Sequence, residues 1–71
     1  MAYEFFQKKV GALVNKANNG SANAISVEFK EDRENGKFFA NCSDGVRFVG
    51  NVLSNKISVL WGSGHMAAVP V

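Results

Sequence analysis

The sequence predicts an α+β fold in which one N-terminal helix packs on a five-stranded antiparallel meander. This fold class is predicted by two patterns of apolar residues and by the change from one to the other. Apolar residues recur at helical spacing over residues 2–18, whereas from about residue 24 onward they alternate at the spacing of strands. Turn-forming residues separate the alternating segments at short intervals. A chain of 71 residues is the size of one domain, so we expect residues 1–71 to form a single unit.

The predicted helix spans about residues 2–18. Its apolar residues lie three or four positions apart and therefore share one face of a 3.6-residue period. They are Phe6, Val10, Leu13, Val14 and Ala17. The run Asn18-Asn19-Gly20 predicts the C-terminal end of the helix, and a loop follows over 20–23. Gly11 lies inside the helix at a cost of about 1 kcal/mol relative to alanine, so we expect it to mark a close approach to a strand.

The first two predicted strands span about residues 24–31 and 37–43. Between them the dipeptide Asn35-Gly36 indicates a two-residue hairpin turn. This turn pairs Phe29 with Cys42. One face of the hairpin is then entirely apolar, as burial of that face requires. The members of this face are Ile25, Val27, Phe29, Phe38, Ala40 and Cys42.

The third predicted strand spans about residues 46–51 and follows a turn at 43–45. A two-residue turn there would bring Arg47 onto the core face beside Cys42. A three-residue turn, with Gly45 in the left-handed conformation, instead pairs Phe48 with Ala40. We predict the second register because it keeps Arg47 out of the core.

The last two predicted strands span about residues 56–62 and 66–70. Pro70 lacks an N–H group, so we expect the fifth strand to lie at an edge of the sheet or to end there. The sheet either stays open or curls into a small barrel. The order of a helix followed by five short strands resembles that of the SH3-like and Sm-like small barrels, and this resemblance concerns element order alone.

Small size and cysteine content favour reinforcement by a partner chain. A chain this short buries only roughly 60% of its unfolded surface, and its one cysteine, Cys42, excludes an intrachain disulfide. A homo-oligomer is therefore expected. The chain starts without the basic and apolar regions of a signal peptide and contains no apolar run of membrane-spanning length. We expect no membrane partner and a reducing, cytoplasmic setting.

The sequence contains no recognisable catalytic, metal-binding or phosphate-binding motif. Cys42 lies on the predicted core face and His65 in a glycine-flanked turn, where a structural role is expected for each. The acidic residues at 28, 31, 32 and 34 are interrupted by basic ones and lack the ligand spacing of a calcium loop. We therefore expect a protein that is not an enzyme, without a cofactor, a metal or an evident small-molecule substrate.

The outward face of the first three strands is the candidate binding site. In the registers above, one row across the sheet contains Lys30, Asn41 and Arg47. The next row contains Asp32, Phe39 and Val49. An aromatic and an aliphatic side chain then lie outside, next to two cations and an amide. The five candidate residues are Lys30, Phe39, Asn41, Arg47 and Val49.

Two functions fit this face. Exposed apolar pairs mark contacts with other protein chains, which predicts a small interaction module that binds a protein partner or itself. Cations beside an aromatic ring are also typical of nucleic-acid-binding sheets, in which bases stack on the ring. The second hypothesis is therefore a nucleic-acid-binding module that uses Lys30, Phe39, Asn41 and Arg47. The two differ in salt dependence, since contacts with phosphate weaken steeply as salt rises.

Overall fold

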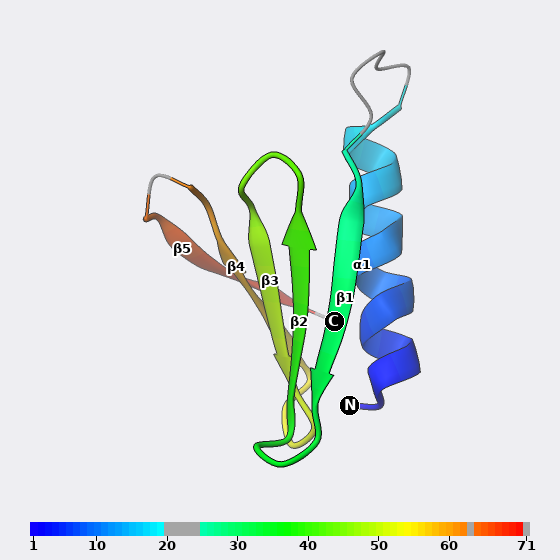
Figure 1. Cartoon of the computed structure of the whole chain (residues 1–71), viewed down its shortest axis with the longest axis vertical. Helices are drawn as coiled ribbons and strands as arrows, with labels where there is room; N and C mark the ends of the chain where they lie inside the picture. Colours follow the sequence, from blue (N-terminus) through cyan, green and yellow to red (C-terminus); the bar gives the residue numbers. More distant parts are fainter. Residues whose placement is uncertain (20–24, 63, 71) are drawn as a thin grey trace.

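A computed structural model of the chain describes residues 1–19, 25–62 and 64–70 and contains one helix and five strands there (Figure 1). The predicted loop over 20–23 and the first residue of the predicted first strand lie outside these residues. The elements are α1 (Tyr3–Ala17), β1 (Val27–Asp32), β2 (Lys37–Cys42), β3 (Arg47–Asn51), β4 (Lys56–Leu60) and β5 (Met66–Pro70). Ile25 and Ser26 precede β1 rather than belonging to it. None of the helical sequence described has the length and apolarity needed to cross a bilayer.

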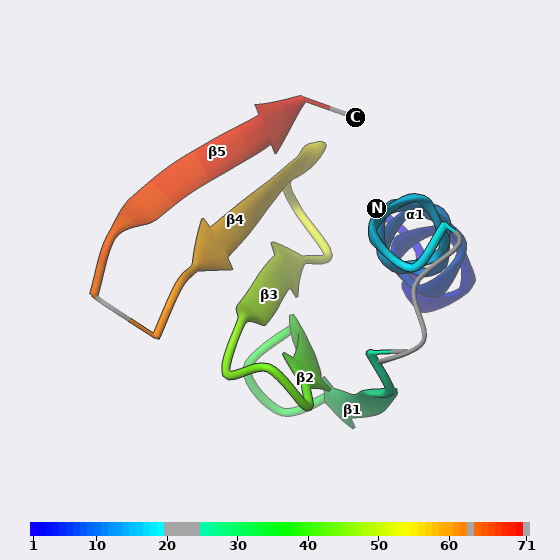
Figure 2. The same ribbon diagram turned by 90° about the horizontal axis from the view of Figure 1, so that it is seen from above.

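The five strands form one antiparallel sheet in the order β1-β2-β3-β4-β5. This arrangement confirms the predicted α+β meander. The described strands do not close into a barrel, because β1 and β5 stand at opposite edges and do not pair with each other. The sheet is nonetheless strongly curved, and α1 lies on its concave side (Figure 2). Twist of this kind follows from the right-handed twist of each strand. Pro70 lies in the edge strand β5, as its missing N–H group requires.

The core lies between α1 and the concave face of the sheet. In β2, β3 and β4 buried residues alternate with less buried ones, so the period of the sequence selects which residues are buried. The buried residues are Phe6, Val10, Val14, Phe38, Ala40, Phe48, Ile57 and Val59. The helix meets this core through Phe6, Val10 and Val14, while Leu13 is only half-buried at the margin. The helix ends at Ala17, close to the predicted end.

Of these two glycines, Gly50 on β3, and not Gly11, marks close packing between helix and sheet. A Cβ atom built on Gly50 would lie 2.6 Å from Cδ1 of Phe6, whereas one on Gly11 would meet nothing within 4 Å. The expectation for Gly11 was therefore wrong. The buried Phe6 ring occupies the space that a side chain on β3 would otherwise take, and it also lies 5.6 Å from the ring of Phe38.

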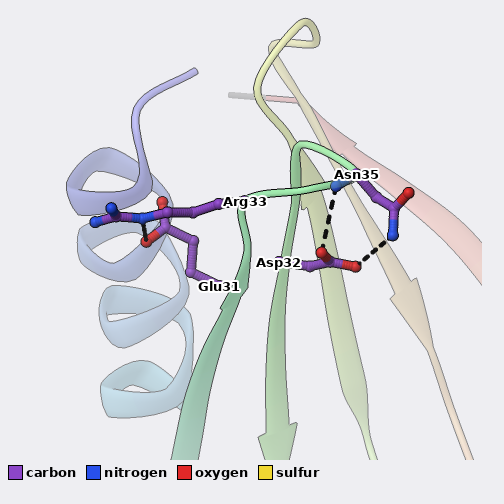
Figure 3. A network of polar contacts seen from close by, with 4 residues as sticks. All are labelled: Glu31, Asp32, Arg33 and Asn35. Carbon is purple, nitrogen blue, oxygen red and sulfur yellow. Dashed lines mark hydrogen bonds and ion pairs between the residues drawn. The ribbon is translucent and has the colours of Figure 1, made fainter.

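The turn between β1 and β2 differs from the predicted one. Asp32 pairs with Lys37 and Phe29 with Ala40, so the connection contains the four residues 33–36 rather than two. The carboxylate of Asp32 explains the longer turn, because it accepts both the backbone N–H and the side-chain amide of Asn35 (Figure 3). Gly36 then adopts a φ of 65°. The register moves by two residues, which leaves every side chain on its predicted face.

The turn between β2 and β3 has the predicted three-residue form. Ala40 pairs with Phe48, and the N–H of Cys42 donates to the carbonyl of Val46 at 2.8 Å. Gly45 has a φ of 93°, in the left-handed region. The carboxylate of Asp44 also accepts the N–H of Val46. Arg47 is thereby kept on the outer face.

Replacing Gly45 by valine should lower the free energy of unfolding by about 1–3 kcal/mol, because a β-branched residue is strained at a positive φ. Space is not the cause, since a Cβ atom on Gly45 would meet nothing within 4 Å. Urea titration followed by circular dichroism measures the change. Gly45→Asn is the control, because asparagine tolerates this backbone conformation. Equal stability of the valine variant and the parent would contradict the strain.

Candidate functional site

The outer, convex face of the sheet contains all five candidate residues, but their rows differ from the predicted ones. The two-residue shift of β1 places Lys30 beside Phe39, which in turn pairs with Val49. Asn41 and Arg47 share the neighbouring row with Glu28 instead of Lys30. The predicted rows were therefore wrong. The error arose from the first turn, because the register between β2 and β3 is the predicted one.

The structure still brings most of the candidate residues together. A shallow depression of about 380 Å³ on this face is lined by Lys30, Phe39, Asn41 and Arg47, together with Glu31 and Asp32. Val49 lies next to it, since it pairs with Phe39. Phe39 and Val49 are half-buried, whereas the two cations and the amide are exposed. The depression therefore has an apolar floor beside polar walls.

Two further apolar residues extend this surface toward β5. Leu60 pairs with Arg47 on one side and with Met66 on the other, so both lie on the outer face. Leu60 is half-buried, and Met66 is 65% exposed. We call Phe39, Val49, Leu60 and Met66 the outer apolar band. The signal for Leu60 was present in the sequence, because Ile57 and Val59 occupy the inner positions of the same strand.

Charged residues of both signs share the outer face with the outer apolar band. Four cations and two carboxylates alternate with it on the outward positions of β1 to β4: Lys30, Lys37, Arg47 and Lys56, with Glu28 and Asp32. The guanidinium of Arg47 is oriented by a hydrogen bond from Nε to Oδ1 of Asn41, 2.8 Å long. The face therefore combines the outer apolar band with six charged residues of both signs, which we call its rim. Arg47 is the one that interrupts the band, because it lies on the central strand between Asn41 and Leu60.

The carboxylates near the β1–β2 turn contact other residues of that turn (Figure 3). Hydrogen bonds from the side chain and backbone of Asn35 hold the pKa of Asp32 below its usual value. Glu31 forms an ion pair with Arg33 at 3.1 Å. Among residues 1–19, 25–62 and 64–70, no group of three or more histidine, cysteine or acidic side chains is placed to hold a metal ion. These carboxylates stabilise the four-residue turn.

Cys42 and His65 lie apart from the outer apolar band. Cys42 points to the concave side and is half-buried, so it is less enclosed than expected for a core thiol. Burial, and to a smaller extent the charge of Asp44, raise the pKa of its thiol. His65 is exposed in the β4–β5 connection, with its ring centroid 5.3 Å from that of Trp61.

The raised pKa predicts slow alkylation of Cys42 in the native state. Iodoacetamide should label the folded protein more slowly than the urea-unfolded protein at the same pH, because only the thiolate reacts. The native rate should increase with pH and should also increase in Asp44→Asn, which removes the neighbouring negative charge. Mass spectrometry of quenched samples measures both rates. Equal rates in the folded and unfolded states would show that Cys42 is a fully accessible, unperturbed thiol.

The chain was compared with known proteins in three ways. A scan against protein-family models, a search of curated proteins and a search of solved structures each found no match to the chain.

Proposed function

We propose that the protein is a small interaction module that binds another polypeptide through the convex face of its sheet. The outer apolar band, with its rim of mixed charge, is the observation that carries this proposal. An apolar centre inside a polar rim is the usual anatomy of a protein–protein interface. Met66 is exposed, and Phe39, Val49 and Leu60 are half-buried on the same face. Apolar residues that gather on one outer face of a small domain favour such a contact.

A second copy of the chain is the partner that we propose first. The rim contains both cations and carboxylates, so a copy related by a two-fold axis can place Lys30 or Arg47 opposite Glu28. The single helix covers only the concave face of the five-stranded sheet. Covering the convex face with a second copy would therefore add stability to this small core. The proposal includes a reducing, cytoplasmic setting, which the lone cysteine supports.

The distribution of charge favours a protein partner over nucleic acid. Glu28 and Asp32 flank Lys30 on the same face of β1, and Glu31 lines the same depression. These carboxylates oppose the approach of phosphate groups, on which nucleic-acid affinity largely depends. A binding role is also favoured over nucleophilic catalysis, because a reactive cysteine needs a lowered pKa and that of Cys42 is raised.

Replacing Phe39 by serine should weaken self-association about tenfold or more, since truncation of a central aromatic residue typically costs at least about 2 kcal/mol. Sedimentation equilibrium over a range of concentrations measures the dissociation constant. Leu53→Ser is the matched control. It also exchanges an apolar side chain for serine, but Leu53 is 94% exposed in the β3–β4 connection, away from this face.

Two outcomes would overturn the proposal. Unchanged association in Phe39→Ser, with its folded circular dichroism spectrum intact, would exclude the convex face as the contact. Salt-dependent binding of a single-stranded oligonucleotide, lost when Lys30 and Arg47 are both replaced by glutamine, would instead establish the nucleic-acid-binding alternative.

A further inference from the structure

The concave side of the sheet contains an apolar pocket of about 290 Å³, independent of the convex face. It lies between the C-terminal half of α1, the turn between β2 and β3, and the β4–β5 hairpin. Its walls include Leu13, Ala17, Phe48, Val59 and Trp61. The pocket exists because α1 packs mainly on β1 and β2, whereas β4 and β5 lie on the opposite side of the concave face (Figure 2).

The wall nearest the helix end is held by a pair of hydrogen bonds. The side-chain amide of Asn18 donates to the carbonyl of Ile25 at 2.9 Å, and its oxygen accepts the N–H of Ile25 at 2.7 Å. This clamp fixes Ile25, which lines the pocket. A wall positioned by directed hydrogen bonds keeps its shape before a ligand arrives, which lowers the entropic cost of binding.

One negative charge lies at the mouth of this pocket. Asp44 provides the only charged side chain among the described residues that line it. Its Oδ1 atom accepts the N–H of Val46 at 3.1 Å, which orients the carboxylate. Asp44 and Trp61 are both exposed and therefore stand at the rim.

From this arrangement we infer that the pocket binds a small apolar molecule that carries a protonated amine. The apolar body fills the space between α1 and β3 to β5, and the ammonium group lies at the rim beside the carboxylate of Asp44 and the aromatic ring of Trp61. The volume suits a single-ring compound, because an engineered apolar cavity of roughly 150 Å³ already holds benzene.

Trp61 provides the first measurement, because it is the only tryptophan of the chain. Its fluorescence is titrated with three compounds of similar size: 2-phenylethylamine, 2-phenylethanol and 3-phenylpropanoate. The amine should bind with a Kd of about 1 mM or below. It should bind about fivefold or more tightly than the alcohol, and the carboxylate should bind most weakly. Saturating amine should also slow the alkylation of Cys42, which lines the pocket.

Two variants test the charge and the space separately. Asp44→Asn keeps an oxygen for the N–H of Val46 but removes the charge, so the amine and the alcohol should bind equally. Ala17→Phe should fill the pocket and abolish binding of all three compounds. Ala12→Phe is the matched control, since Ala12 is exposed on the same helix and does not line the pocket. Neither Asp44 nor Ala17 lies on the convex face. Failure of the amine to bind would therefore count against this inference alone and not against self-association through the convex face.

Three results would overturn the inference. Absence of a saturable response to any compound up to about 10 mM would exclude the site. Equal affinity of the parent protein for all three compounds would exclude recognition of an amine. Concentration-dependent association of the parent that is lost in Ala17→Phe, without binding of the amine, would show that a second copy of the chain fills the pocket.

Discussion

Replacing Phe6 by alanine should lower the free energy of unfolding by about 3–5 kcal/mol. The side chain is 0% exposed, and its ring lies 6.2 Å from that of Phe29 and 5.6 Å from that of Phe38. It is the largest fully buried side chain and forms the centre of the contact between helix and sheet. A domain of this length is typically stable by only about 4–10 kcal/mol, so the substitution should remove a third or more of the stability of the fold.

Phe5→Ala is the matched control for this experiment. Phe5 is the neighbouring residue of the same helix but is only half-buried, and Lys9 lies over its ring at 5.5 Å. Its truncation should cost less, about 1–2 kcal/mol, because part of its apolar surface remains in water in the folded state. Urea denaturation of the two variants and the parent measures the difference. Equal costs for Phe5 and Phe6 would show that the helix packs through another face.

Replacing Gly50 by alanine should lower the free energy of unfolding by about 1–3 kcal/mol, although alanine ordinarily suits a strand better than glycine. The added Cβ would lie 2.6 Å and 2.9 Å from two ring carbons of Phe6 and 3.3 Å from one of Phe38. Both rings are buried and packed against each other, so neither can move aside freely. The packing of Phe6 and Phe38 against β3 must therefore loosen.

Gly11→Ala serves as the control and should change stability in the opposite direction. Gly11 lies within α1, where an added Cβ would meet nothing within 4 Å. Alanine there should raise the free energy of unfolding by about 0.5–1 kcal/mol, because glycine loses more backbone entropy in a helix. Thermal melts of the two variants show the sign directly. A neutral or stabilising Gly50→Ala would show that α1 lies farther from the sheet.

The two hairpins show which parts of the register could be predicted from the sequence. The register between β2 and β3 followed from a single requirement, that Arg47 stay out of the core, and the structure confirms it. The register between β1 and β2 was predicted from the dipeptide Asn35-Gly36 alone. The competing signal was Asp32, whose carboxylate accepts two hydrogen bonds from Asn35 and stabilises a four-residue turn. An aspartate three residues before an asparagine could have indicated that turn.

The sequence predicted correctly that the five candidate residues lie on the outer face of the sheet. It predicted incorrectly which of them are neighbours across the strands. Alternation places Phe39 and Val49 outside whenever Phe38 and Ala40 are inside, whatever the register. Which residue of β1 lies beside Phe39 depends instead on the register, and the shift of β1 made it Lys30 rather than the predicted Asp32. Outward positions on β4 and β5 were not recognised as part of the face. Their cross-strand neighbours depend on the registers of two further strand pairs, which no single turn in the sequence indicates.

The sequence by itself determined the class of fold, the order of the elements and the inner and outer faces of β1, β2 and β3. These depend on periods of two and 3.6 residues and on local turn chemistry, which neighbouring residues encode. Only the tertiary structure decided that the sheet stays open, that Phe6 fits against Gly50, and that Asp44 and Trp61 border one pocket. These features join residues far apart in the chain, and they depend on the curvature of the sheet and on the position of α1 across it, to which many side chains contribute at once.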